Sequence, residues 1–116
     1  MHEISLVRNI FRTLEQEFSE AERAEITAIH LRVGLLSNVE PLLMQNAFEA
    51  VTATDAPHFS AVRLEIETVP IEIYCESCAQ SSGVENYRFA CAHCGLPNNN
   101  IVKGTELLIS RVEFGE

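Results

Sequence analysis

The sequence predicts an α+β protein, in which a small mixed three-stranded sheet packs with two helices and carries an inserted zinc-ribbon-like module. Two segments have apolar residues at helical spacing, and three others alternate apolar with polar residues as strands do. Four cysteines in the pattern Cys-x2-Cys-x12-Cys-x2-Cys lie between the last two strand segments. We therefore expect an α/β domain of residues 1–69 with 101–116, and a zinc-binding module of residues 70–100.

The composition limits the classes of function that the chain can have. Its 116 residues are 47% hydrophobic but only 7% aromatic, which predicts a mostly aliphatic core. No apolar run approaches the roughly 20 residues of a membrane-spanning helix. The net charge of -9 argues against nucleic acid as the main ligand, because a nucleic-acid-binding surface is basic. The amino terminus does not resemble an export signal, so we expect a cytoplasmic protein.

The opening segment, residues 4–18, predicts a helix that is followed by a polar stretch, residues 19–25, where we expect the helix to end. Apolar residues spaced by three and four positions form a single stripe along this segment. The stripe consists of Val7, Ile10, Phe11, Leu14 and Phe18.

A strand and a second helix follow. Residues 29–35 alternate apolar side chains with polar or small ones, as in a half-buried strand. Ser37 and Glu40 have the spacing of a capping box, and Pro41 is well tolerated in a first helical turn. The apolar face of the helix that they introduce consists of Met44, Ala47, Phe48 and Val51.

The remaining segments predict a loop and two more strands. Residues 52–60 contain turn-forming residues, and residues 62–66 alternate as a strand. Pro70 interrupts the extended segment after this strand, and we place the domain boundary there. We expect the last strand at about residues 105–114. The order strand, helix, strand predicts a right-handed crossover connection.

The cysteines Cys75, Cys78, Cys91 and Cys94 are the strongest chemical signal in the chain. Two such pairs can place four thiolates around one tetrahedral Zn2+ ion. A filled shell leaves no position for a reactive water, so we expect a structural site. The surrounding segment has few core-forming residues, and metal binding must supply much of its folding free energy. The alternatives are two disulfides, which need an oxidising compartment, or free buried thiols.

Met1, His2 and Glu3 form a second, weaker metal-binding pattern. Removal of Met1 requires a small second residue, so we expect His2 to keep Met1 and its free α-amine in place. The amine, the His2 backbone nitrogen and its imidazole can form adjoining chelate rings, a near-planar donor set that suits Ni(II) or Cu(II). Glu3 offers a further backbone nitrogen or a carboxylate. The alternative is a frayed terminus that holds no metal.

Other polar residues give no catalytic pattern. We expect His30, His58 and His93 to be surface residues rather than ligands. The sequence has no Ser-His-Asp constellation, phosphate-binding loop or convincing carboxylate pair. We therefore expect that the protein is not an enzyme.

Several of these patterns occur together, in order, in one known family. The chain resembles the HypA/HybF family of hydrogenase nickel-incorporation proteins over almost its whole length. The resemblance rests on Met1-His2-Glu3 running into an amphipathic helix, the stretch RVGLLSNVEP at 32–41, Ala47-Phe48-Glu49, the two cysteine pairs, and VKGTEL at 102–107.

This resemblance implies a nickel metallochaperone that helps insert Ni(II) into the large subunit of [NiFe]-hydrogenase. It implies that His2 anchors the nickel together with amino-terminal nitrogens, that Glu3 contributes, and that the four cysteines hold zinc separately. The first domain would then be the nickel-binding one. The implied partners are the maturation GTPase HypB, the hydrogenase large subunit and, for some members, urease maturation proteins. We expect a monomer or a homodimer.

Two other kinds of function are compatible with the same residues. A zinc-ribbon adaptor would use its cysteines only to fold, and would carry no transferable metal. A small enzyme has the least support, because no residues in the chain could carry the catalysis.

Overall fold

The structure, a computed structural model, describes residues 2–115 and leaves Met1 and Glu116 outside the described residues. The helices are α1 (His2–Glu17), α2 (Glu20–Ala24) and α3 (Pro41–Thr54), and the 3-10 turns are η1 (Leu35–Ser37) and η2 (Pro57–Phe59). The strands are β1 (Ile26–Gly34), β2 (Arg63–Val69), β3 (Glu72–Cys75), β4 (Gln80–Gly83), β5 (Ile101–Lys103) and β6 (Leu107–Phe114). In the described part of the chain, no helix is long and apolar enough to cross a membrane.

The chain forms two compact units. The first contains residues 1–32, 39–67 and 108–116, and the second contains residues 33–38 and 68–107. Strands β1, β2 and β6 each begin in one unit and end in the other. Each unit therefore combines segments that are distant in the sequence.

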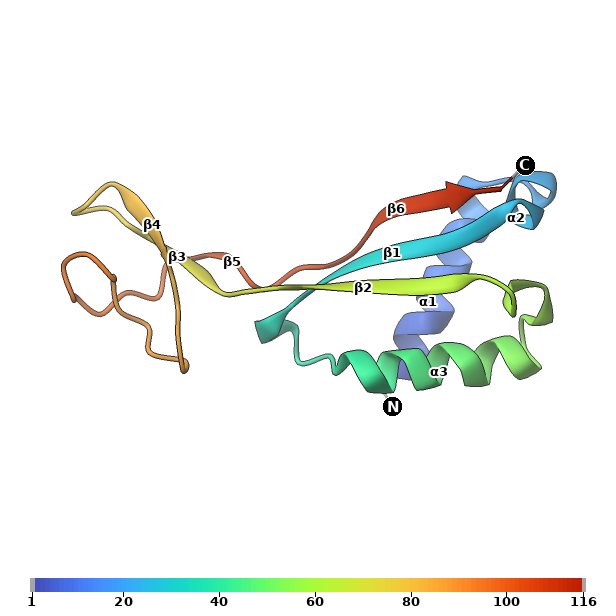
Figure 1. Ribbon diagram of the computed structural model, residues 1–116, viewed down its shortest axis with the longest axis horizontal. Helices are drawn as coiled ribbons and strands as arrows, with labels where there is room; N and C mark the ends of the chain where they lie inside the picture. The colour runs from blue at the N-terminus through green and yellow to red at the C-terminus, as the bar shows by residue number, and fades with distance from the viewer. Residues whose placement is uncertain (1, 116) are drawn as a thin grey trace. The chain divides into compact units, whose positions relative to one another are not determined.

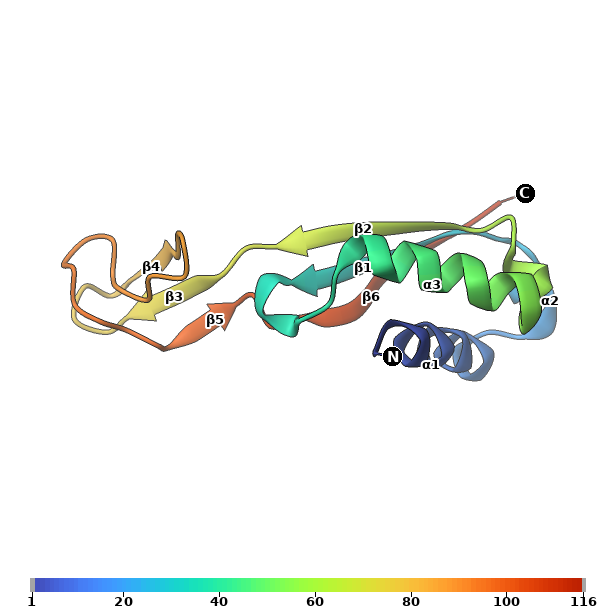
Figure 2. The same ribbon diagram turned by 90° about the horizontal axis from the view of Figure 1, so that it is seen from below.

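A three-stranded sheet in the order β2-β1-β6 is the centre of the first unit. The arrows of β1 and β2 point the same way in Figure 2, and β6 runs against them. The Gly115 N–H donates a 2.6 Å hydrogen bond to the Glu25 carbonyl where β6 ends beside the start of β1. Helices α1 and α3 lie on the same face of this sheet (Figures 1 and 2). The predicted mixed sheet with two helices is thus confirmed.

Apolar side chains from both helices and the sheet fill the core of the first unit. The Phe11 ring stacks on Phe59 at a centroid distance of 4.7 Å and lies 5.5 Å from Phe48. Burying side chains of this size contributes roughly 1.5–3 kcal/mol each. Four members of the predicted α1 stripe are buried, and Phe18 is half-buried against the edge of the Phe114 ring. The buried positions on α1 and α3 are Glu3, Val7, Ile10, Phe11, Leu14, Met44, Ala47, Phe48, Val51 and Thr52.

Helix α2 occupies the polar stretch where we expected α1 simply to end. Its first turn has a capping box: the Ser19 hydroxyl accepts from the Glu22 N–H at 3.1 Å, and the Glu22 carboxylate accepts from the Ser19 N–H at 2.8 Å. The helix buries none of its residues, so it has no apolar stripe in the sequence. The three-residue spacing of Ser19 and Glu22, which is that of a capping box, is the sequence feature that could have predicted α2.

The capping box predicted at Ser37 and Glu40 is wrong. Residues 35–37 form η1, and the Ser37 hydroxyl donates to the Gly34 carbonyl at 2.7 Å. Asn38 follows in the left-handed region with φ 62°. Glu40 itself is the N-cap of α3, and its carboxylate accepts a weak 3.4 Å hydrogen bond from the Leu42 N–H. The chain reverses before the helix begins, which separates Ser37 from the helix.

Several element ends also differ from prediction, and strand β6 begins at Leu107 rather than at residue 105. Strand β1 begins at Ile26 and ends at Gly34, so that Leu35 is 47% exposed instead of lying in the strand. Helix α3 continues to Thr54 into the predicted loop. The Thr52 hydroxyl is buried there and donates to the Phe48 carbonyl at 2.9 Å, which satisfies a polar group that would otherwise oppose burial.

The second unit has a sheet of its own in the order β4-β3-β5. Strand β3 pairs antiparallel with β4, with Ile73 opposite Ser82 and Cys75 opposite Gln80. It also pairs antiparallel with β5, where Ile73 lies opposite Ile101 and the register shifts beside it. Val69, Ile71, Ile73, Cys75 and Cys91 are its buried apolar residues outside β1. A core this small needs another source of stability.

Two glycines allow a close backbone approach within the second unit. A Cβ atom on Gly34 would lie 2.1 Å from the Gly104 carbonyl carbon and oxygen. Gly104 has φ 114°, a conformation that favours glycine, and accepts a 2.7 Å hydrogen bond from the Leu36 N–H. The neighbouring Gly34 N–H donates to the Glu106 carbonyl at 2.7 Å. These two positions explain why glycine occurs within the segments 32–41 and 102–107.

Candidate metal centre

The fold brings all four cysteine sulfur atoms to one place in the second unit. They lie within 4.8 Å of one another, and they form the only group of three or more potential metal-binding side chains of His, Cys, Asp or Glu in the part of the chain that the structure describes. Cys75 and Cys91 are buried, Cys78 is half-buried and Cys94 is exposed.

Short turns hold the cysteines in this arrangement. Cys75 is the last residue of β3, and Cys78 follows in the tight turn that leads to β4. Cys91 opens the second turn: its N–H donates to the Leu96 carbonyl, and its carbonyl accepts from the Gly95 N–H, both at 2.9 Å. Gly95 has φ 76°, which glycine adopts without a steric penalty.

The sulfur separations fit a tetrahedral metal and exclude disulfides. The Sγ atoms of Cys75 and Cys94 are 3.8 Å apart, as are those of Cys78 and Cys91. A disulfide would require about 2.05 Å. A tetrahedron with Zn–S bonds of about 2.3 Å has edges of about 3.8 Å. The donor set and its size therefore suit a four-coordinate Zn2+ ion.

The electrostatics of the cluster favour a cation at its centre. Backbone N–H groups of Cys94 and His93 lower the pKa of the Cys91 thiol to about 6, and the His93 N–H lies 3.4 Å from the Cys91 sulfur. The hydrogen bond with Cys94, together with burial, raises the pKa of Cys78 to about 12. One thiol thus ionises readily, whereas full ionisation of all four needs a positive charge among them.

The amino-terminal candidates are only partly described. Met1 lies outside the described residues, and so does the side chain of His2, whose backbone begins α1. The Glu3 side chain is only 8% exposed, and it makes no hydrogen bond or ion pair with any other described residue.

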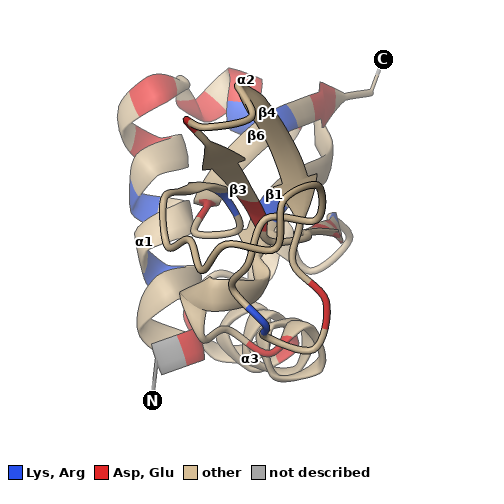
Figure 3. Cartoon of the chain, turned by 90° about the vertical axis from the view of Figure 1, so that its left-hand side faces the viewer, with Lys and Arg blue, Asp and Glu red and all other residues tan. Residues whose placement is uncertain are grey.

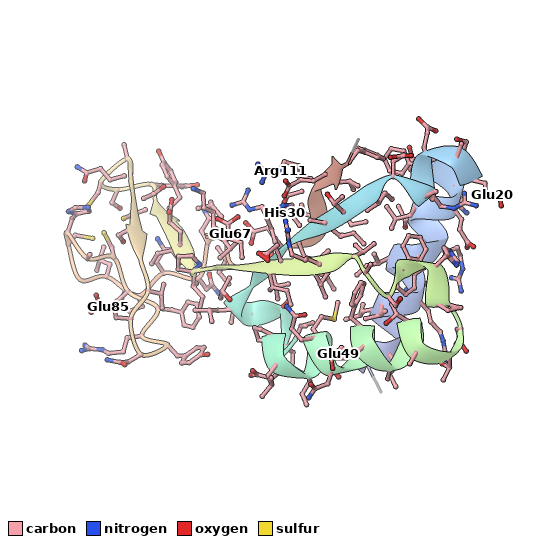
Figure 4. All side chains as sticks on the ribbon, turned by 45° about the vertical axis from the view of Figure 1, so that its right-hand side comes forward. Glu20, His30, Glu49, Glu67, Glu85 and Arg111 are labelled. Atoms are coloured by element: carbon pink, nitrogen blue, oxygen red, sulfur yellow. The ribbon has the colours of Figure 1, made fainter. Side chains whose placement is uncertain are left out.

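The other histidines differ in their surroundings. His58 and His93 are exposed, as predicted. His30, predicted as a surface residue, has a side chain that is only 22% exposed and pairs with Glu113. Arg111 lies 3.3 Å from the same His30 nitrogen, and Figure 4 shows these two labelled side chains together on the sheet face away from the helices. The contact between His30 and Glu113 joins residues that are 83 positions apart. The alternation of residues within one strand cannot reveal such a pair.

Basic residues on the described surface lie among a larger number of acidic ones (Figure 3). Along α1, Figure 3 shows basic residues in the middle of the helix and acidic residues on both sides of them. On the sheet, Arg32 lies 3.5 Å from Glu67 and Arg63 lies 3.8 Å from Glu113. This distribution differs from the continuous basic stripe of a nucleic-acid-binding face.

Comparison with known proteins adds to this geometry. Residues 1–114 match the family described as "Hydrogenase/urease nickel incorporation, metallochaperone, hypA". A protein of Chloroflexus aggregans named hydrogenase maturation factor HypA is 36% identical, with 97% of this chain and 98% of that protein covered. A protein of the same name from Roseiflexus sp. is 33% identical, with 98% and 92% covered.

A relative with a different name is similarly close. The guanidine hydrolase-activating protein A of Synechocystis sp. is 34% identical, with 97% of this chain and 94% of that protein covered. Among solved structures, the HypA metallochaperone of Helicobacter pylori aligns with a TM-score of 0.65 at 20% identity, covering 97% of each chain. A second HypA solution structure aligns with a TM-score of 0.69 at 22% identity, with 98% of this chain and 96% of that chain covered. At these identities the two structures establish a shared fold.

Proposed function

Because the chain belongs to the HypA family of hydrogenase/urease nickel-incorporation metallochaperones, we propose that it binds Ni(II) through Met1, His2 and Glu3. It delivers the ion to the large subunit of a [NiFe]-hydrogenase. The observation that carries this proposal is the family match over residues 1–114, which includes the amino terminus. Glu3 is 8% exposed and directly follows the other two proposed ligands in the sequence.

The proposed nickel ligands suit a cargo that must be released. The α-amine of Met1 and the backbone and imidazole nitrogens of His2 give adjoining chelate rings, and the Glu3 carboxylate adds a negative charge. Ligands at the end of a chain exchange more easily than those of a closed cage. We expect roughly micromolar nickel affinity, equivalent to about 8 kcal/mol.

Cys75, Cys78, Cys91 and Cys94 hold a structural Zn2+ ion in this proposal. The support is the sulfur spacing of 3.8 Å and the closed four-thiolate donor set. Such an ion stabilises the second unit and leaves no position for water, so it is a poor cargo site and supplies no catalysis. The chain therefore acts as a metal carrier rather than as an enzyme.

The proposed partners follow from the family. They are the GTPase HypB, the hydrogenase large subunit and, because the family description includes urease, urease maturation proteins. We place the protein with these partners in the cytoplasm. A second candidate recipient is a guanidine hydrolase, which is favoured by the 34% identity to the Synechocystis activating protein.

A nickel titration tests the proposal directly. Protein with its native amino terminus is titrated by calorimetry beside His2→Ala, with zinc content measured in both. We expect His2→Ala to abolish nickel binding and to leave one zinc ion in place. His58→Ala, an exposed histidine outside both the amino terminus and the cysteine cluster, is the matched control and should bind nickel as the parent does.

The outcome also separates this function from an adaptor that carries no transferable metal. A native-terminus protein that binds no nickel would favour the adaptor. Nickel binding that survives His2→Ala would disprove the ligand assignment.

A further inference from the structure

The loop that follows the second cysteine pair contains three consecutive asparagines, and only the first of them is half-buried. Asn98 lies between the exposed residues Pro97 and Asn99, and Asn100 is exposed as well. A polar side chain that is withdrawn from solvent in an otherwise exposed loop needs hydrogen-bond partners. The partners of Asn98 lie on both of the chain segments that lead into the cysteine pairs.

The side chain of Asn98 connects this loop to the first cysteine pair. Its Nδ2 atom donates a 2.7 Å hydrogen bond to the carbonyl of Tyr74, the residue before Cys75. The Tyr74 N–H donates in turn to the Asn100 carbonyl at 3.0 Å. The pairing of β3 with β5 ends one residue before Tyr74, so the Asn98 amide supplies a donor that a longer β5 would otherwise provide. The bond therefore satisfies a main-chain acceptor directly beside a cysteine of the metal site.

The backbone of Asn98 connects the same loop to the second cysteine pair. Its N–H donates a 2.9 Å hydrogen bond to the carbonyl of Phe89, two residues before Cys91. Beside this bond, Ala90 and Pro97 form an isolated antiparallel bridge. A single residue thus forms hydrogen bonds to the segments that lead into both cysteine pairs.

These contacts require the amide group of an asparagine. The Oδ1 atom of Asn98 accepts from the Asn100 N–H at 2.7 Å, which closes a local turn, while Nδ2 donates to the Tyr74 carbonyl. An aspartate could close the same turn, but it would have no donor for the Tyr74 carbonyl. An alanine could make neither bond. The turn and the bond to β3 are therefore separable by substitution.

We propose that Asn98 is a positioning residue of the metal site: it holds the second cysteine pair against the first, so that the four thiolates keep the spacing that Zn2+ requires. Both sulfur separations of 3.8 Å run between the pairs, from Cys75 to Cys94 and from Cys78 to Cys91. They depend on how the two chain segments lie against each other, and not on the geometry within either pair. The inference rests on the proposed zinc occupancy of the cysteines.

Another hydrogen bond between the two segments is weaker. The Ala92 N–H donates to the Ser82 hydroxyl on β4 at 3.2 Å, and this contact is exposed to solvent. Water can replace an exposed bond at little cost, whereas a partly buried group that loses its partner pays for its desolvation. The bond from Asn98 to Tyr74 is both shorter and partly buried. Its loss should therefore affect the metal site more than the loss of the Ser82 contact.

The rate of zinc release from the full-length, zinc-loaded chain tests the proposal. Each protein, checked first for one zinc ion per chain, is mixed with an excess of a coloured zinc chelator, and zinc transfer is followed by absorbance. Asn98→Ala should release zinc about five- to tenfold faster than the parent, as expected for the loss of one partly buried hydrogen bond. Asn99→Ala is the matched control and should keep the parent rate, because its exposed side chain makes no hydrogen bond with any described residue.

Asn98→Asp separates the bond to β3 from the local turn. It keeps an acceptor for the Asn100 N–H but has no donor for the Tyr74 carbonyl. It should release zinc about as fast as Asn98→Ala, even though its added negative charge favours a bound cation. A role confined to the turn would leave Asn98→Asp at the parent rate, and that result would overturn the proposal.

Cobalt substitution reports the arrangement of the thiolates separately from stability. Co2+ binds the same kinds of site as Zn2+ with lower affinity, and its visible absorption bands depend on ligand geometry. The parent and Asn99→Ala should share one spectrum, whereas Asn98→Ala should show shifted and weaker bands. Identical spectra in the parent and Asn98→Ala would mean that Asn98 only stabilises the loop, which overturns the proposal. A parent that holds no zinc would instead overturn the zinc assignment, a failure distinct from equal release rates in zinc-loaded variants.

Discussion

Among single residues, Glu113 shows how one carboxylate can organise a sheet face. The hydrogen bond from His30 is the main cause that lowers the Glu113 pKa below its ordinary value of 4.5, and the positive charges of Arg111 and Arg63 add to it. These guanidinium groups lie 3.6 and 3.8 Å from the same carboxylate oxygen. A group with a depressed pKa in the folded state favours folding above its unfolded pKa.

This shift gives a prediction about acid stability. The contribution of Glu113 is present above pH 4.5 and is lost as the pH falls through its lower folded pKa. Glu113→Gln should therefore lower Tm near neutral pH, and the difference from the parent should shrink at pH 3. Thermal melts at the two pH values measure this difference. Glu65→Gln on β2 is the control. A difference in Tm between Glu113→Gln and the parent that is the same at both pH values would contradict the prediction.

At the scale of elements, amphipathic segments were predictable and exposed or metal-dependent ones were not. The α1 stripe and the alternation in β1 and β2 report burial directly, because one face of each is apolar. Helix α2 buries nothing, and β4 and β5 are too short and too exposed to show a period. The spacing of the cysteines predicted their proximity, since the ligands of one metal must converge. The His30–Glu113 pair depends on strand order, which no local pattern specifies.

The close approach of the Gly34 and Gly104 backbones gives a prediction at this scale. In Gly34→Ala, the new Cβ would meet the Gly104 backbone at 2.1 Å, and backbone atoms cannot move aside as a flexible side chain can. We expect a loss of roughly 1–3 kcal/mol or more in the free energy of unfolding, as for other overpacked sites. Chemical denaturation of the zinc-loaded protein measures it.

Gly83→Ala is the matched control for this substitution. No atom lies within 4 Å of the position that its Cβ would occupy. It should leave stability unchanged or raise it by about 0.4–1 kcal/mol, because alanine restricts the unfolded chain. Equal losses in the two variants would show that the close approach at Gly34 is not what requires glycine.

For the whole molecule, the two units depend on different sources of stability. The first unit contains the aromatic cluster of Phe11, Phe48 and Phe59 and buries apolar residues from two helices and a sheet. The second unit buries few large side chains, and two of its buried residues are the cysteines Cys75 and Cys91. Its folding free energy must come largely from the metal.

Zinc removal should therefore unfold one unit and spare the other. Treatment with a chelator under reducing conditions removes the cation that balances the charge of the four ionised thiols. Residues 68–107 should then unfold, and their amide signals should lose dispersion in 15N-correlated NMR spectra. Signals from α1 and α3 should keep their dispersion, because the aromatic core contains no metal ligand. Cys75→Ser should reproduce the spectrum of the chelated protein. Adding zinc back should restore the dispersed signals in the chelated parent protein but not in Cys75→Ser. Collapse of both sets of signals together would mean that the first unit cannot fold without the metal-bound second unit.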